Sequence, residues 1–145
     1  FAVRALRAAG PAAPYTAGMS AEAAAVLFQA CGLCKRAWAT WEGFVMDPEV
    51  RLLGLQAVTN PEFNVLVFEH RCGSSISILT RRLRHLDSGP EPDAPRPTLR
   101  DTDQCRGHCR LLEDLESCDA PCANARDRRL IQLVQRMKKE AQPGG

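Results

Sequence analysis

The sequence predicts an α+β fold that is mostly helical: a small zinc-stapled module with a short strand or hairpin, followed by a C-terminal helical hairpin. Apolar residues recur mainly at helical spacing, and the best strand candidate is confined to residues 64–69, where β-branched and aromatic residues run together. Aromatic residues make up only 6% of the 145 positions, so the hydrophobic core is small for the length. Small cores usually need a staple, and seven cysteines can provide one.

Changes in composition divide the chain into four parts. Residues 1–19 are expected to be a disordered tail, although the Ala-, Pro- and Arg-rich stretch 1–18 also has the composition of an organelle transit peptide. Residues 20–87 are expected to form the zinc-binding module. Four prolines within residues 88–97 predict an extended Pro-rich linker. Residues 98–145 are expected to form the Cys-containing helical hairpin.

The individual elements follow from periodicity and from turn residues. In the first module we expect helices over residues 20–30, 38–45 and 50–58, a strand over 64–69, and either a returning strand or a helix from 75 that continues to 86. In the last segment we expect a helix over residues 99–116, a break near Pro121, and a second helix that runs almost to the C-terminus.

The first cysteine set combines Cys31-x-x-Cys34 with His70-x-Cys72. Two residues between cysteines let one tight turn offer both sulfurs to a single ion, and a distant second pair closes a tetrahedral site. His70 and Cys72 would lie on the same face of one strand. We therefore predict that Cys31, Cys34, His70 and Cys72 bind zinc, for which three cysteines and one histidine are a normal set. The alternatives are buried apolar cysteines on a continuous helix and a thiol redox pair.

The order of these residues resembles a short zinc-ribbon-like segment of bacterial signalling proteins, in which Cys-x-x-Cys-Lys precedes a Trp and a returning His and Cys. The residues that carry the resemblance are Cys31, Cys34, Lys35, Trp41, His70 and Cys72. The chain departs from that pattern in its His-x-Cys spacing and in lacking a closing Cys-x-x-Cys. The resemblance implies no catalytic activity.

A second set consists of two Cys-x3-Cys pairs separated by eight residues, namely Cys105, Cys109, Cys118 and Cys122. Residues i and i+4 share one face of a helix, so two such pairs on antiparallel helices would face each other. They would then bind a second metal ion, form two disulfides (Cys105 with Cys122, Cys109 with Cys118), or stay reduced and partly buried; His108 is an alternative ligand. The pattern is similar to the paired Cys-x3-Cys helical hairpins of the mitochondrial intermembrane space, but the separation is short for that family.

Charge and motifs exclude several classes of function. The net charge of +2 is too small to indicate nucleic-acid binding by itself. Basic residues gather at Arg81, Arg82 and Arg84, without aromatic residues that would stack on bases. The sequence has no phosphate-binding glycine loop, no Gly-x-Ser-x-Gly elbow and no His-Glu-x-x-His. No reaction is therefore predicted.

Together these features predict a small metal-stabilised protein-interaction or assembly module, cytoplasmic and without catalysis of its own. A protein partner or a second copy would bind the apolar stripe of the last helix, formed by Leu130, Leu133, Val134 and Met137. The alternatives are a thiol redox or metal-handling protein that uses the Cys105–Cys122 set, and a nucleic-acid-binding zinc protein that uses the Arg81–Arg84 region. No apolar stretch approaches the roughly 20 residues that a membrane span needs.

Overall fold

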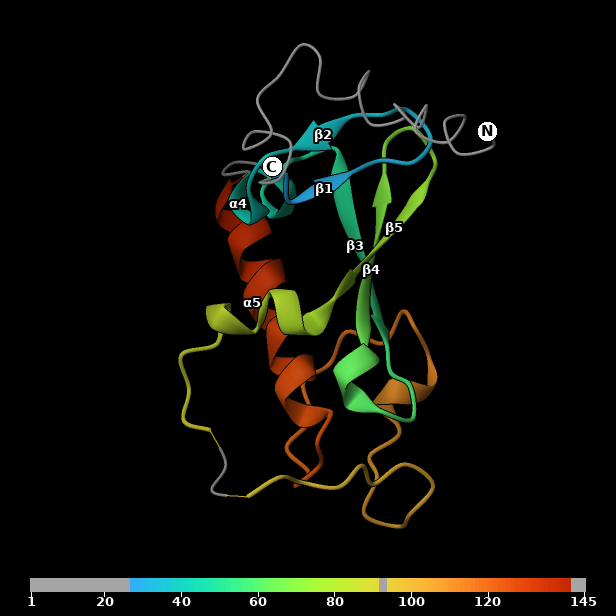
Figure 1. The fold of residues 1–145 in the computed structure, drawn as a ribbon. Helices are drawn as coiled ribbons and strands as arrows, with labels where there is room; N and C mark the ends of the chain where they lie inside the picture. The colour runs from blue at the N-terminus through green and yellow to red at the C-terminus, as the bar shows by residue number, and fades with distance from the viewer. Residues whose placement is uncertain (1–26, 92–93, 142–145) are drawn as a thin grey trace, which may run out of the picture.

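A three-stranded antiparallel sheet with one long helix beside it forms the centre of the computed structural model, which describes residues 27–91 and 94–141 (Figure 1). The strand order is β3-β4-β5, with bounds β3 (Val50–Gln56), β4 (Val65–His70) and β5 (Ser75–Leu79). A separate two-stranded sheet pairs β1 (Gln29–Ala30) antiparallel with β2 (Ala37–Trp38). The helices are α4 (Trp41–Val45) and α5 (Ala125–Ala141), and the 3-10 turns are η1 (Pro61–Phe63), η2 (Thr80–Arg82), η3 (Arg84–Leu86) and η4 (His108–Arg110).

The prediction of a mostly helical chain is wrong, and β3 shows why. Residues 50–58 were expected to form a helix, but most of them form a strand that pairs with β4. A bulge between Leu52 and Gly54 inserts one extra residue into β3. The buried residues Val50, Leu52 and Leu55 are therefore spaced by two and then three positions, which hides the alternation typical of a strand.

The other elements of the first module depart from the prediction in the same direction. Gln29 and Ala30 are extended, and residues 20–26 of the expected first helix lie outside the described residues. The expected helix over 38–45 shrinks to α4, and the one expected to reach residue 86 is replaced by β5 followed by η2 and η3. The strand predicted over 64–69 is confirmed as β4.

The predicted C-terminal helical hairpin is also wrong, because residues 99–116 contain only the short turn η4. This segment is held by hydrogen bonds from the buried side chain of Arg128, and not by the backbone hydrogen bonds of a helix. The guanidinium of Arg128 is fully buried and donates to the carbonyl oxygens of His108 (3.3 Å), Asp114 (2.6 Å) and Glu116 (2.6 Å). These bonds satisfy backbone acceptors of the segment without a helix.

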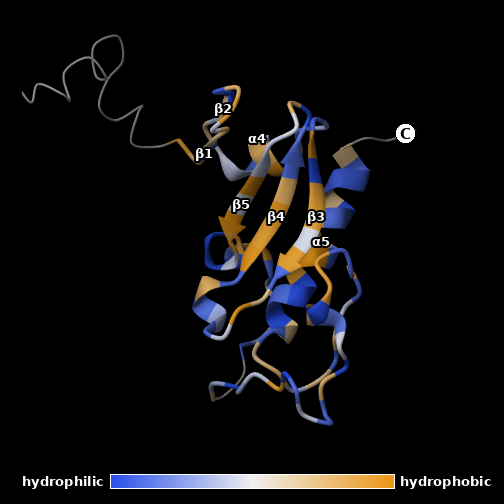
Figure 2. Ribbon diagram, turned by 90° about the vertical axis from the view of Figure 1, so that its right-hand side faces the viewer, coloured by the Kyte–Doolittle hydropathy of each residue, from blue (hydrophilic) through white to orange (hydrophobic). Residues whose placement is uncertain are grey.

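The hydrophobic core lies between the sheet and α5, which packs against β3. The strands are mostly hydrophobic, whereas α5 also carries many hydrophilic residues (Figure 2). Leu130 and Val134 of the predicted apolar stripe are fully buried in this core, and Leu133 and Met137 pack against it. That this stripe binds a partner stays a prediction. No helix among the described residues is long and apolar enough to cross a membrane.

The segment before α5 also contacts the sheet directly, at Gly54 in the bulge of β3. A Cβ atom at this position would lie 1.6 Å from the carbonyl oxygen of Leu112. Only glycine permits so close an approach of two backbones. The irregular segment is therefore packed onto the sheet rather than extended away from it.

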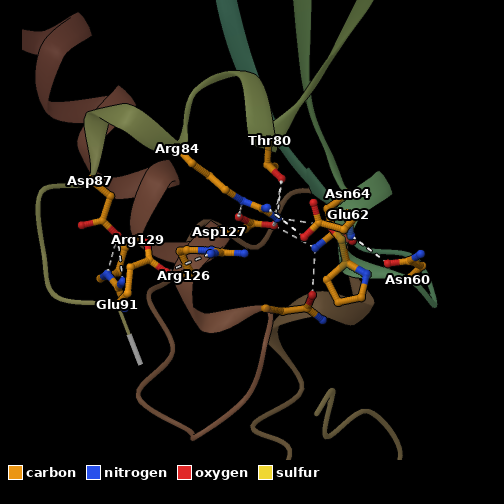
Figure 3. A network of polar contacts seen from close by, with 12 residues as sticks. Asn60, Glu62, Asn64, Thr80, Arg84, Asp87, Glu91, Arg126, Asp127 and Arg129 are labelled. Atoms are coloured by element: carbon orange, nitrogen blue, oxygen red, sulfur yellow. Dashed lines mark hydrogen bonds and ion pairs between the residues drawn. The ribbon is translucent and has the colours of Figure 1, made fainter. Parts of the chain in front are cut away.

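A buried carboxylate joins the start of α5 to the residue just before β4 and the residue just after β5 (Figure 3). Asp127 is fully buried and accepts hydrogen bonds from Asn64 Nδ2 (2.9 Å) and Thr80 Oγ1 (2.9 Å). Arg84 Nε lies 3.3 Å from the second oxygen. Because a buried charge is stable only when it is paired and hydrogen-bonded, these contacts fix the helix relative to the sheet.

Replacing Asp127 by alanine is expected to lower the free energy of unfolding by about 3–5 kcal/mol, because the partly buried Arg84 cation and two buried polar groups lose their acceptor. The matched control is Glu62→Ala, which removes the other carboxylate bound to Arg84, one that is 54% exposed. Its cost should not exceed about 1 kcal/mol. Urea unfolding of both variants measures the difference, and equal costs would contradict a structural role for Asp127.

Candidate metal centre

Two turns meet at one end of the molecule and bring four metal-binding side chains together. The turn between β1 and β2 supplies Cys31 and Cys34, and the end of β4 with the following turn supplies His70 and Cys72 (Figure 1). One ligand atom from each residue lies within 4.8 Å of all the others. A cluster of three sulfurs and one imidazole this compact could hold a metal ion.

The individual distances show that the histidine takes part through Nδ1. This atom lies 3.2 Å from Cys72 Sγ and 3.5 Å from Cys34 Sγ. The sulfurs of Cys31 and Cys72, from different turns, are 3.5 Å apart. Cys31 and His70 are buried, whereas Cys34 and Cys72 are exposed, so the cluster is open to solvent on one side.

Backbone hydrogen bonds shape both turns. In the β1–β2 turn the N–H of Cys31 donates to Arg36 O (2.7 Å), and the N–H of Lys35 donates to Cys31 O (3.0 Å). In the β4–β5 turn the N–H of His70 donates to Ser74 O (2.9 Å). Gly73 in this turn has a φ of 97°, a conformation that favours glycine. The two turns thus present their ligands at the ends of the β1–β2 and β4–β5 hairpins.

Ser74 stabilises the anionic form of two of the cysteines. Its hydroxyl lies 2.9 Å from Cys31 Sγ and 3.3 Å from Cys72 Sγ. This hydrogen bond, with backbone N–H groups of the turn, lowers the pKa of Cys31 to about 5. The Ser74 hydroxyl and backbone N–H also lower the pKa of Cys72. The thiolate is the form of cysteine that binds metals.

The pKa values of the other two ligands respond to these neighbouring sulfurs. The backbone N–H of Arg36 lowers the pKa of Cys34, but burial and the thiols of Cys31 and Cys72 outweigh it and raise the pKa above its usual value. The hydrogen bond with Cys72 raises the pKa of His70. The negative charge of a Cys31 thiolate thus opposes ionisation of Cys34, and a cation at the centre of the cluster would relieve that repulsion.

The second imidazole nitrogen of His70 points away from the sulfurs toward a carboxylate. His70 Nε2 is buried without a hydrogen-bond partner among the described residues, and Glu49 Oε1 lies 3.9 Å away. The Glu49 carboxylate also pairs with Arg71 at 3.1 Å. Metal-binding histidines usually direct their free N–H to such an acceptor, which fixes the tautomer and leaves the other nitrogen free to bind.

The indole ring of Trp38 packs against the imidazole of His70. Trp38, only 4% exposed, contacts His70 edge-on with ring centroids 5.3 Å apart. The Trp38 Nε1–H donates to Asp47 Oδ2 (2.7 Å), and Arg36 donates to the same oxygen (2.9 Å). Asp47 thus fixes the ring that packs against the ligand.

Ser74, Glu49 and Trp38 were not among the predicted site residues. A signal for Ser74 was available, because it follows Cys72 by two positions in a Gly-containing turn. The contacts of Glu49 and Asp47 depend on the tertiary fold and leave no local pattern.

The structure places the second cysteine set elsewhere and without facing helices. Cys105, Cys109, Cys118 and Cys122 are all free and partly buried, and they line one small cavity. Burial raises the pKa of the Cys109 thiol. His108, the alternative ligand, is paired instead with Asp114 at 3.0 Å.

The basic residues considered for nucleic acid make contacts within the chain. Arg84 is bound to Asp127 and Glu62. The guanidinium of Arg82 stacks on Phe28 at 4.2 Å from the ring centroid, and that of Arg81 lies 5.9 Å from Phe63. These interactions account for the cluster without an external ligand.

Comparisons with known protein families, with curated proteins and with solved structures give no match. The function is therefore argued from the geometry of the chain itself.

Replacing Glu49 by alanine is expected to weaken Zn²⁺ binding by about 10- to 100-fold, because the imidazole loses the carboxylate that faces its Nε2 at 3.9 Å. The control is Glu69→Ala, since Glu69 lies next to His70 in sequence but pairs with Arg51 on the sheet. Competition with a chromophoric chelator measures both affinities. An equal affinity in the two variants would show that Glu49 does not orient His70.

Proposed function

We propose that Cys31, Cys34, His70 and Cys72 bind one zinc ion that holds the β1–β2 hairpin against the sheet, and that the protein is a zinc-stabilised interaction module without catalysis of its own. The observation that carries this proposal is the convergence of four ligand atoms from two turns within 4.8 Å of one another.

The type and spacing of the ligands support zinc. Thiolates select zinc, copper(I) and iron–sulfur clusters over magnesium and calcium. In a tetrahedral zinc site with Zn–S bonds of about 2.3 Å, sulfur atoms lie roughly 3.8 Å apart. The Cys31 and Cys72 sulfurs, 3.5 Å apart, need to move only slightly to reach this separation.

The number of ligands supports a structural role for the ion. Catalytic zinc sites typically have three protein ligands and leave the fourth position to water or substrate. Here the chain offers four ligands, which close a tetrahedral site. The Glu49 carboxylate lies beside His70 Nε2, the nitrogen that faces away from the sulfurs.

A metal ion bound by four protein ligands has no free position for a substrate, so it can stabilise a rigid surface but does not provide a reaction centre. This supports the interaction role. Leu33, between the two cysteines of the β1–β2 turn, is 65% exposed. A bound ion would fix the turn backbone that carries this apolar side chain. Preorganised exposed side chains of this kind lower the entropy lost on association. A second copy of the chain is the partner that can be tested directly.

Metal analysis of protein purified without added metal tests the zinc site. We expect the Cys34→Ser variant to hold one zinc ion fewer per chain than the wild type, whereas His70→Cys, which keeps four soft ligands, should retain that ion. Cobalt substitution should give visible tetrahedral absorption bands that Cys34→Ser weakens. The same metal content in Cys34→Ser and in the wild type would refute the site.

Sedimentation velocity of the zinc-loaded chain over a range of concentrations tests the interaction role. We expect self-association that weakens in Leu33→Asp, because a charge would replace an apolar contact, while the metal content stays unchanged. Leu27→Asp, which changes a residue 41% exposed outside the turn, is the control. Association that is absent, or equal in the two variants, would contradict a role for this turn.

A further inference from the structure

Four further cysteines converge in the segment that precedes α5, at the opposite end of the sheet from the first cluster (Figure 1). They are Cys105, Cys109, Cys118 and Cys122, and all line a single cavity of about 20 Å³. A space of this size accepts one water-sized particle, so it suits a single ion and excludes an organic cofactor.

Backbone N–H groups are directed at two of these sulfurs. The amide two residues after each of these cysteines donates to its sulfur, Gly107 to Cys105 Sγ and Asn124 to Cys122 Sγ, both at 3.4 Å. The N–H of Leu99 is a second donor to Cys122 Sγ, also at 3.4 Å. Hydrogen bonds from backbone N–H groups to the ligand sulfurs are a common feature of metal sites built from cysteines.

The same arrangement occurs at the first cluster, where the backbone N–H of Ser74 donates a hydrogen bond to Cys72 and that of Arg36 donates one to Cys34. In each case the donor follows its cysteine by two positions. Gly107, whose φ is 86°, adopts the left-handed conformation in its turn, as Gly73 does in the turn that follows Cys72. The two cysteine sets thus share one local backbone design.

The charge around the cavity also suits a metal bound by thiolates. Arg128 lines the cavity and has a fully buried guanidinium. Its one carboxylate partner in the described part of the chain is Asp114, 23% exposed, at 3.2 Å. A divalent ion with four thiolates carries a net charge of −2, which would offset the Arg128 cation, and a buried cation needs such a partner.

We propose that Cys105, Cys109, Cys118 and Cys122 bind a second soft divalent cation, zinc first, in a four-sulfur site that fixes residues 98–124 at the start of α5. This site is independent of the first. Among the described residues only the first cluster has all its ligand atoms within 4.8 Å of one another. Binding of one ion by all four sulfurs therefore requires the turns that carry the second set to close around it.

Native mass spectrometry of the full chain with added Zn²⁺ tests the proposal. We expect two ions per wild-type chain, one in Cys34→Ser, one in Cys118→Ser and none in the double variant. A Cys118→Ser chain that holds as many ions as the wild type overturns the second site. Failure of the first site instead appears as a Cys34→Ser chain that holds as many ions as the wild type, so the two proposals are tested separately.

Differential alkylation tests the same proposal on the wild-type chain, so the result does not depend on whether the variants fold. Cys105, Cys109, Cys118 and Cys122 should resist alkylation in the Zn²⁺-loaded protein and react once a chelator is added. Reaction at full rate before the chelator overturns the proposal. Protection that a reductant abolishes and a chelator does not also overturns it, and identifies disulfides in its place.

Discussion

The convergence of three sulfurs and one imidazole nitrogen within 4.8 Å is the constraint on which the N-terminal part of this structure depends. β1 and β2 are two residues each, and an isolated two-stranded hairpin is marginally stable at best. The hairpin meets the main sheet through Trp38, which contacts His70 of β4, and through the ligand cluster. A metal bound there would contribute directly to folding, by about 10–16 kcal/mol in zinc-finger peptides.

The residues around the cluster determine which form its ligands take. Ser74 hydrogen-bonds Cys31 and Cys72, and the pKa of each is lowered. Glu49 faces the nitrogen of His70 that points away from the sulfurs, and Trp38 packs against the ring. The cluster thus combines two cysteines whose thiolate forms are stabilised with a buried imidazole, a set that could hold a metal ion.

The sequence was most informative where a local pattern matches a local structure. The Cys31-x-x-Cys34 and His70-x-Cys72 spacings correspond to two tight turns, and the β-branched run before His70 corresponds to β4. The apolar stripe that includes Leu130 and Val134 also predicted a helix correctly, as α5. Each of these depends on residues a few positions apart.

The errors arise where distant contacts override the local pattern. The bulge in β3 shifts its buried residues out of alternation, so the strand resembled a helix. The path of residues 99–116 is fixed by hydrogen bonds from Arg128, which lies outside that segment, to backbone carbonyl oxygens within it. Glu49 and Asp47 reach the site only in the folded chain. No window of sequence contains these interactions.

Hydrogen–deuterium exchange before and after chelation tests the central claim most directly, because it reports on the hairpin itself. If a metal holds the β1–β2 hairpin to the sheet, chelation will increase exchange at residues 28–38 and 70–74, while β3 and the middle of β4 stay protected by their own ladder. Unchanged exchange in the hairpin of a chain shown to lose its metal would contradict the account.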